Sequence, residues 1–259
     1  MTQALANKCV WVTRPQGQAD LLCQLIEQQQ AEAVHFPVIE IRPAGDTSDH
    51  VACFRQLDQY YAIIFTSRNA VNAAFAAGLH ADAIASSTRV WAIGAATAEQ
   101  LHEQGIEKAA HAGGQADSEA LLSLPELQSD QINGKPILLV KGLGGRELLA
   151  ETLISRGASL QLAEVYQRCL PRFETNFVTN LWQNKSPDVI LVTSNDGLKN
   201  LVELTPDEYR TQLYRTPLVL MSMRMLDYAK YAGFISTLEV AVEKSDPGLL
   251  SALLKLSGD

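Results

Sequence analysis

The residues that could do chemistry include two polar stretches, each placed directly after an apolar run. They are TSRN at residues 66–69 and TSND at residues 193–196. Ser67, Ser194 and Thr97 could suggest a hydrolase, but none of them lies in the G-x-S-x-G motif of a nucleophilic serine. We predict instead that these hydroxyl groups cap helices, each cap stabilising the protein by about 1 kcal/mol. A capped helix start still presents free N–H groups, so capping is compatible with ligand binding.

Cationic residues follow the first apolar run in each half of the chain. Arg14 lies in VTRP, and Lys141 begins a glycine-rich loop in which Gly144 would let a ligand approach the backbone closely. Arg146 would stand at a helix start, where free N–H groups favour an anion. Glu147 occupies the place of the third glycine of a dinucleotide fingerprint, and the Gly-Lys-Ser/Thr ending of a phosphate loop is missing from the sequence. A tight turn and an anion site are equally good interpretations of this loop.

Two further side chains stand beside predicted strands. Tyr166, in EVYQR, either anchors two domains by burial or takes part in catalysis. Arg224, in SMRM, follows a short apolar run and is either a solvated surface residue or a cation facing a crevice. Its position after a strand end favours the crevice, because ligands of open α/β sheets bind there.

The overall composition excludes several classes of protein. A net charge of −8 argues against general nucleic-acid binding, so an acidic ligand would need a local basic crevice. The four cysteines and five histidines lack the spacing of zinc ligands, which predicts reduced thiols and no metal site. No apolar stretch approaches the ~20 residues of a membrane-spanning helix, and the first residues do not resemble an export signal. We therefore expect a cytoplasmic protein that binds neither membranes nor nucleic acid.

The chain contains an internal duplication. Four segments recur in the same order with a nearly constant offset, which is 127 for the first pair (138 − 11) and 128 for the third (218 − 90). The pairs are 11–22 with 138–149, 65–67 with 192–194, 90–106 with 218–234, and 117–122 with 245–250. Sequence identity within each pair is low, which indicates an old duplication.

Each half repeats the same alternation of strand and helix. Residues 137–140 (ILLV) are apolar on both faces, as a parallel strand covered by helices must be. A helix is expected over 147–156, ending at Gly157 in the left-handed conformation, and Gly105 and Gly233 should end helices in the same way. This alternation predicts α/β domains built on parallel sheets, with a ligand crevice at the loops after the strands' carboxyl ends.

Two extended, proline-bounded segments interrupt this pattern at equivalent places in the two halves. We expect these segments, residues 36–43 and 162–171, to form a two-stranded connector between two similar domains. The inserted domain is then 44–161, and the other domain combines 1–35 with 172–259.

Taken together, these segments resemble the uroporphyrinogen-III synthase family. The similarity runs through most of the chain, from VTRP at the start through FTSRNAV, AIGAATAEQL and DSEALL to AKYAG near the end. Its most specific part is GGRELL…EVYQR, within residues 144–168. The resemblance implies two α/β domains joined by a two-stranded connector, the same layout that the residue pattern predicts.

The resemblance also implies a function. Uroporphyrinogen-III synthases are cytoplasmic lyases of tetrapyrrole and haem biosynthesis that need no metal or organic cofactor. Their substrate hydroxymethylbilane, a linear tetrapyrrole polycarboxylate, loses water, and the macrocycle closes with inversion of the terminal pyrrole ring. We expect this chain to act on that small-molecule substrate, as a monomer.

The resemblance further implies roles for the side chains named above. Tyr166 is expected to be the acid that assists loss of hydroxide, since a phenol is protonated at neutral pH. The substrate's carboxylates are expected to bind to Arg14, Ser67, Arg68, Thr97, Lys141, Gly144, Arg146, Ser194, Ser222 and Arg224. The family often carries threonines in the loop that reads MSMR here (residues 221–224), so Ser222 is the candidate to replace their hydroxyl.

Two other functions fit parts of the pattern. A non-catalytic two-lobed binding protein would also use duplicated α/β domains and a double connector. The missing export signal and the GGRELL…EVYQR segment favour the synthase over it. The second of these functions is a nucleotide-dependent enzyme, and the missing third glycine of the dinucleotide fingerprint argues against it.

Overall fold

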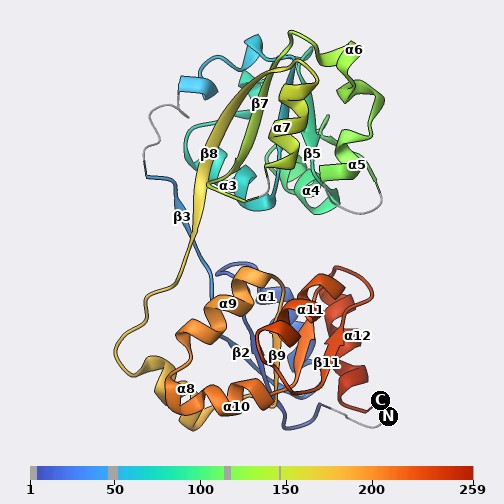
Figure 1. The fold of residues 1–259 in the computed structure, drawn as a ribbon. Coiled ribbons are helices and arrows are strands. Elements are labelled where there is room, and N and C mark those ends of the chain that lie inside the picture. The colour runs from blue at the N-terminus through green and yellow to red at the C-terminus, as the bar shows by residue number, and fades with distance from the viewer. Residues whose placement is uncertain (1–4, 46–51, 114–117, 146, 259) are drawn as a thin grey trace. The chain divides into compact units, whose positions relative to one another are not determined.

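The chain forms two compact units, which are described separately. The computed structural model describes residues 5–45, 52–113, 118–145 and 147–258. Met1–Glu40 and Cys169–Asp259 make up one unit, here called the terminal unit, and Ile41–Arg168 make up the other, here called the middle unit. Each unit is a sheet with parallel strand pairs and helices packed against it (Figure 1). The predicted α/β fold class, with parallel sheets flanked by helices, is therefore confirmed.

The terminal unit holds a five-stranded sheet in the order β11-β10-β9-β1-β2, and its neighbouring strands are parallel. The strands are β1 (Cys9–Val12), β2 (Glu32–His35), β9 (Val189–Val192), β10 (Leu218–Leu220) and β11 (Leu238–Val240). The helices are α1 (Asp20–Glu27), α8 (Phe177–Asn184), α9 (Asn195–Leu204), α10 (Arg210–Arg215), α11 (Met223–Tyr231) and α12 (Asp246–Leu256). The central strand β9 is wholly buried, because it is apolar on both faces and the helices cover it.

The middle unit holds a six-stranded sheet in the order β3-β8-β7-β4-β5-β6. Its strands are β3 (Glu40–Pro43), β4 (Ala62–Phe65), β5 (Arg89–Ala92), β6 (Ala110–His111), β7 (Pro136–Gly142) and β8 (Ser159–Cys169). Its described helices include α3 (Arg68–Ala76), α4 (Ala95–Glu103), α5 (Ser118–Leu122), α6 (Ser129–Ile132) and α7 (Leu148–Ser155). The two segments expected to form a connector contribute to β3 and β8, which are neighbours in this sheet. Next to them, the Ala44 N–H donates to the Val165 carbonyl at 3.2 Å.

The duplication is visible in the register of the strands. The order β11-β10-β9-β1-β2 corresponds to β6-β5-β4-β7-β8. Cys9 lies opposite Glu32 in the terminal unit, and Pro136 lies opposite Ser159 in the middle unit, so both partners move by 127 (136 − 9 and 159 − 32). The two units therefore share one register as well as one strand order.

The duplication extends to rare backbone conformations. Asn7 and Gln30 have left-handed φ angles of 62° and 61°, and their equivalents at an offset of 127 are Gly134 and Gly157, with 72° and 89°. The N–H of Asn7 donates to the Gln30 carbonyl at 3.1 Å, and the N–H of Gly134 donates to the Gly157 carbonyl at 2.8 Å. The same turn is thus built with glycines in one unit and with larger residues in the other.

The helix ends follow the sequence predictions with one exception. Gly105, Gly157 and Gly233 all have positive φ angles just after helices, as expected. Ser67 and Ser194 cap α3 and α9, but the prediction that Thr97 is a cap was wrong. Gly94 is the N-cap of α4, and Thr97 is buried in the third position of that helix.

The described residues contain no helix that is both long enough and apolar enough to span a membrane.

Candidate functional site

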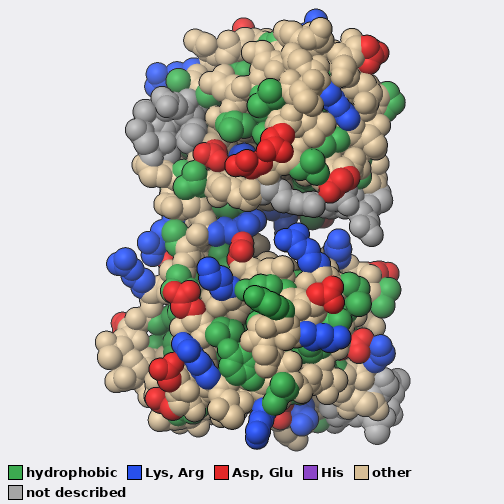
Figure 2. Space-filling view, viewed as in Figure 1, with side chains coloured by type: hydrophobic (Ala, Val, Ile, Leu, Met, Phe, Trp, Pro, Cys, Tyr) green, Lys and Arg blue, Asp and Glu red, His purple; other side chains and the backbone are tan. Residues whose placement is uncertain are grey.

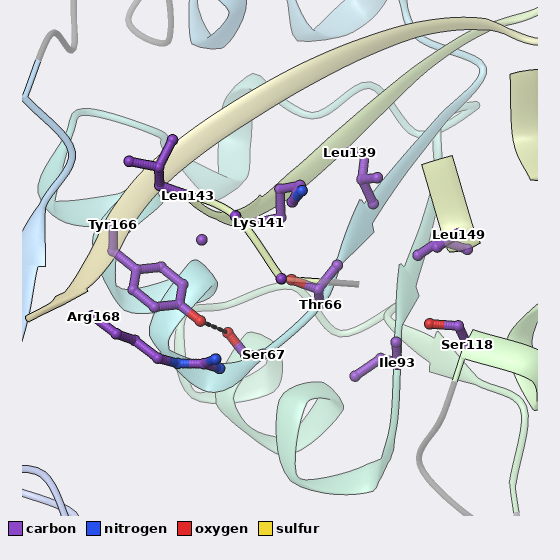
Figure 3. Close-up of a pocket in the computed structure, with 13 residues that line it drawn as sticks. Thr66, Ser67, Ile93, Ser118, Leu139, Lys141, Leu143, Leu149, Tyr166 and Arg168 are labelled. Carbon is purple, nitrogen blue, oxygen red and sulfur yellow. Dashed lines mark hydrogen bonds between the residues drawn. The ribbon is translucent and has the colours of Figure 1, made fainter. Parts of the chain in front are cut away.

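A pocket of about 250 Å³ opens at the carboxyl ends of the central strands of the middle unit. Thr66 and Ser67 reach it from the end of β4, and Ile93 from the end of β5. The end of β7 and the loop after it supply residues 141–145, while Tyr166 and Arg168 come from β8 (Figure 3). Ser118 and Leu149 add the first turns of α5 and α7. Strand ends and helix starts therefore enclose this cavity, as expected for an open α/β sheet.

Tyr166 is buried and lines this pocket. The residue is 3% exposed, and its phenol oxygen lies 3.1 Å from the Ser67 hydroxyl oxygen (Figure 3). The same Ser67 oxygen accepts a hydrogen bond from the Ala70 N–H at 3.0 Å, which caps α3. The phenol is thus held at the start of a helix, where N–H groups give a local positive potential.

The Tyr166 ring lies against the backbone of Gly142. A Cβ atom at position 142 would lie 2.6 Å from Tyr166 Cζ, so a side chain there would displace the ring. The strand register shifts between Lys141 and Gly142, which brings Gly142 opposite Tyr166, and the Leu143 N–H donates to the Tyr166 carbonyl at 2.7 Å. Gly142 therefore makes room for the tyrosine.

Glycine is required at positions 144 and 145 for a different reason, which is the backbone conformation. Gly144 and Gly145 have φ angles of +71° and +87°, and no described atom lies within 4 Å of a Cβ built on either. Their conformation, which side chains rarely adopt, requires glycine even though space is free. The loop is therefore a glycine turn whose backbone borders the pocket.

Among the described residues, Lys141 and Arg168 are the cations that border the pocket, and both have partners. Lys141 Nζ lies 3.6 Å from Glu164 Oε1, and the two side chains are 11% and 29% exposed. Arg168 extends beside the ring of Tyr166 (Figure 3) and has a bonding partner of its own. A long ion pair with a partly hydrated carboxylate leaves Lys141 available to a stronger anionic partner.

The terminal unit has a corresponding pocket of about 230 Å³ where α9 and α11 begin. Ser194 lines it and caps α9 by accepting from the Gly197 N–H at 3.0 Å. Ser222 is the N-cap of α11, and its side chain accepts no capping hydrogen bond among the described residues. Arg224 supplies a cation and Asp196 an opposing carboxylate. On the viewed face of this unit, Lys and Arg side chains lie among Asp, Glu and hydrophobic side chains (Figure 2).

Some of the residues predicted for the site line one of these two pockets, and others lie outside both. Ser67, Lys141, Gly144 and Tyr166 line the pocket of the middle unit, and Ser194, Ser222 and Arg224 line that of the terminal unit. Three others lie elsewhere, and they are Arg14, Arg68 and Thr97. Arg146 falls outside the described residues.

Arg14 takes part in a buried ion pair. Its guanidinium contacts Asp246, and the two side chains are 11% and 15% exposed. The same guanidinium nitrogen, Nη1, also donates to the Gln18 carbonyl at 3.3 Å. Arg68 is exposed at the first position of α3, and neither it nor Thr97 is among the described residues that line the pockets. The contacts of Arg14 with Asp246 and Gln18 indicate that this arginine has a structural role in the terminal unit.

Sequence reasoning missed Arg168 and Ser118. Glu164, Tyr166 and Arg168 alternate along β8, and side chains two residues apart point to the same face of a strand. This alternation was readable from the sequence and would have placed Arg168 beside Tyr166. Ser118 had a weaker signal, its position at the start of a repeated segment.

Among the described residues, no group of three or more His, Cys, Asp or Glu side chains is placed to hold a metal ion.

Comparison with known proteins gives consistent matches over nearly the whole chain. The family model described as "Uroporphyrinogen-III synthase HemD" matches residues 20–248. A uroporphyrinogen-III synthase of Escherichia coli K12 is 34% identical over 256 residues, which is 94% of this chain and 99% of that protein. The enzyme of the same name from Salmonella typhimurium LT2 is 35% identical over 251 residues, with the same coverage.

Solved structures agree in fold. A uroporphyrinogen III synthase mutant from the extremely thermophilic bacterium Thermus thermophilus matches with a TM-score of 0.61 at 19% identity, covering 96% of this chain and 97% of that one. A uroporphyrinogen-III synthetase from Helicobacter pylori 26695 matches with a TM-score of 0.63 at 15% identity, covering 96% and 99%. At these identities the likeness concerns the fold alone.

Proposed function

Because the chain belongs to the uroporphyrinogen-III synthase family, we propose that it forms uroporphyrinogen III at the pocket around Tyr166. The chain is a lyase of porphyrin and haem biosynthesis. Its proposed substrate is hydroxymethylbilane, and the proposed reaction removes water, inverts the terminal ring and closes the macrocycle without a cofactor.

The first step needs an acid. Breaking the C–O bond releases hydroxide, which leaves as water when it receives a proton, and a reactive azafulvene remains on the substrate. Tyr166 is the candidate donor, because its hydroxyl lies at the pocket and is already held by Ser67. A general acid contributes about 10²- to 10⁴-fold to the rate of such a step.

The later steps are a problem of orientation. The azafulvene would close spontaneously without inversion, so the substrate must be bent until the terminal ring attacks through its substituted carbon. This attack gives a spiro intermediate, from which the inverted ring is closed. Fixing the reacting atoms in such a geometry can supply much of the barrier reduction without a further reactive group.

The bent pose would be held through the substrate's carboxylates. In the middle unit, Lys141 and the backbone of the loop at Gly144 border the pocket and could bind anions. In the terminal unit, Ser194, Ser222 and Arg224 lie at the starts of α9 and α11, where helix N–H groups favour negative charge. Each set is proposed to bind carboxylates within its own unit.

The observation that carries the proposal is the Tyr166 hydroxyl, fixed at a pocket that also contains a cation. The test supplies purified protein with hydroxymethylbilane and separates the products after oxidation. The III isomer is expected. Formation of the I isomer alone, as without an enzyme, would contradict the synthase function and favour the binding-protein alternative.

The proposal also includes a cytoplasmic location and a monomeric enzyme. Sedimentation velocity of the active protein would check the second point, and a sedimentation coefficient corresponding to 28.3 kDa is expected. A stable dimer would overturn it.

A further inference from the structure

The hydroxyl of Ser67 stands between a helix start and the Tyr166 phenol. A serine hydroxyl can donate one hydrogen bond and accept two. One acceptor position is taken by the Ala70 N–H at 3.0 Å. The proton of Ser67 is therefore free to point toward Tyr166, whose oxygen lies 3.1 Å away.

Two directions of this second hydrogen bond are possible. If Tyr166 donated to Ser67, the phenol proton would be used in that bond and would not be available to a ligand in the pocket. If Ser67 donates to Tyr166, the phenol proton can rotate into the pocket. After Tyr166 gives up that proton, its oxygen still accepts a hydrogen bond from the Ser67 hydroxyl. The second direction also aligns all the donors from the Ala70 N–H through Ser67 to Tyr166, and aligned hydrogen bonds strengthen one another.

The rest of the surroundings fixes the ring of Tyr166. Gly142 closes one side of the ring, and the Leu143 N–H holds the Tyr166 backbone at 2.7 Å. Among the described residues, the charged groups on the elements that carry Tyr166 and Ser67 or border the pocket include Lys141 on β7, Glu164 and Arg168 on β8, and Arg68 at the start of α3. All four are unchanged when Ser67 alone is replaced, so a Ser67 variant isolates the hydroxyl.

The duplicated unit separates this contact from ordinary helix capping. Ser194 is the equivalent of Ser67 (194 − 67 = 127) and caps α9 with the same 3.0 Å bond. The equivalent of Tyr166 is Ile39 (166 − 39 = 127), which has no hydroxyl. Capping therefore needs no tyrosine, and the bond to the phenol is a second task that Ser67 alone has of the two serines.

We propose that Ser67 is a positioning residue, which donates to the Tyr166 oxygen, links it to the start of α3 and keeps the phenol proton directed into the pocket. The inference rests on the proposed function for what Tyr166 does with that proton. The hydrogen bond itself can be tested without substrate.

The test follows the phenol directly. The protein is labelled with 3-fluorotyrosine, and the ¹⁹F signal that disappears in Tyr166→Phe is assigned to Tyr166. The variant to compare is Ser67→Gly, because glycine keeps most of the capping free energy while it removes the hydroxyl. Ser67→Thr restores the hydroxyl, and Ser194→Gly is the matched control in the other unit.

Loss of the donor disfavours the ionised phenol, so the titration midpoint of the Tyr166 signal should rise by about one pH unit in Ser67→Gly. It should return to the parent position in Ser67→Thr and stay there in Ser194→Gly. Burial, with a smaller contribution from Cys53, raises the pKa of Tyr60 to about 12, so its signal is an internal reference that should not move. A Tyr166 midpoint that is unchanged or lower in Ser67→Gly would overturn the inference.

Turnover gives the second measurement. Ser67→Gly should lower kcat about tenfold with KM little changed, and Ser67→Thr should restore it. A rise in KM with constant kcat would show that Ser67 binds substrate and would overturn the positioning role. A shifted phenol midpoint in a protein that forms only the I isomer would support the hydrogen bond and contradict the proposed function.

Discussion

The terminal and middle units share one strand register but differ at one equivalent place, here called the corner. It consists of the cation at or just after the end of β1 or β7 and the first residue of α12 or α5. Lys141 is the equivalent of Arg14 (141 − 14 = 127), and Ser118 is the equivalent of Asp246 (246 − 118 = 128). In the terminal unit, Arg14 and Asp246 form a buried ion pair. In the middle unit, Lys141 and Ser118 line an open pocket. One copy of the fold thus fills this corner, and the other leaves it available to a ligand.

The difference follows from side-chain chemistry. A carboxylate at the start of α12 lies at the positive end of a helix and neutralises Arg14. The serine at the start of α5 carries no charge, and Lys141 makes a long contact to Glu164 instead. A duplicated fold can therefore divide stability and ligand binding between its copies through a few substitutions.

The largest expected effect concerns the ion pair. Asp246→Asn leaves Arg14 buried without a charged partner and should lower the free energy of unfolding by about 3 kcal/mol. Lys141→Met, at the equivalent corner, should change it by less than about 1 kcal/mol, because that contact is long and partly hydrated. Urea denaturation measures both. Equal losses would mean that the two corners do not differ in the way described.

Gly142→Ala tests the packing of the tyrosine. The added Cβ would lie 2.6 Å from Tyr166 Cζ, so the ring must move, and a displaced catalytic group costs about 100-fold in kcat. Gly45→Ala is the control, since no described atom lies within 4 Å of a Cβ there and its φ is not positive. Steady-state kinetics with hydroxymethylbilane should separate the two variants; a fully active Gly142→Ala enzyme would refute the packing argument.

Ser118→Asp copies the acidic residue of the terminal unit into the middle unit. A carboxylate in the pocket would repel the substrate's carboxylates and compete for Lys141, so KM should rise about tenfold. Ser123→Asp adds the same charge at an exposed place just after α5 and should leave KM unchanged. The comparison of the two KM values decides whether Ser118 keeps the corner open. No difference between them would remove Ser118 from the site.

The smallest expected effect concerns the shared turn. Gln30→Gly gives the terminal unit the glycine that the middle unit has at Gly157, and it relieves a left-handed conformation in a residue with a side chain. The greater freedom of glycine in the unfolded chain offsets part of this gain, which leaves about 0.5–1 kcal/mol of stabilisation. Thermal unfolding measures it, and a lower Tm would show that the Gln30 side chain makes a compensating contact.

Local pattern and repetition made the fold predictable. The apolar run of β4 and its counterpart β9 are read directly as buried parallel strands, and the offset of 127 pairs the two units. Thr97 was misread because the extended Gly94 takes the capping position ahead of it. Glycine in that role leaves no hydroxyl signal in the sequence.

The site was predictable only in part. Ser67, Lys141 and Tyr166 were found because each follows or lies in a strand at an edge where parallel strands end together, and their roles stay predictions. Arg14 occupies an equivalent position, yet its partner Asp246 lies 232 residues along the chain (246 − 14). Such a pairing depends on tertiary packing, so no local pattern reveals that the arginine is neutralised.

The most direct test of the account measures ring closure in a single turnover with excess enzyme and hydroxymethylbilane. Tyr166→Phe removes the phenol oxygen and should slow formation of the III isomer about 100-fold. Tyr61→Phe, whose ring packs under Arg89 in the same unit, is the matched control and should keep the parent rate. Equal rates in the parent enzyme and both variants would contradict the claim that the Tyr166 hydroxyl acts at this pocket.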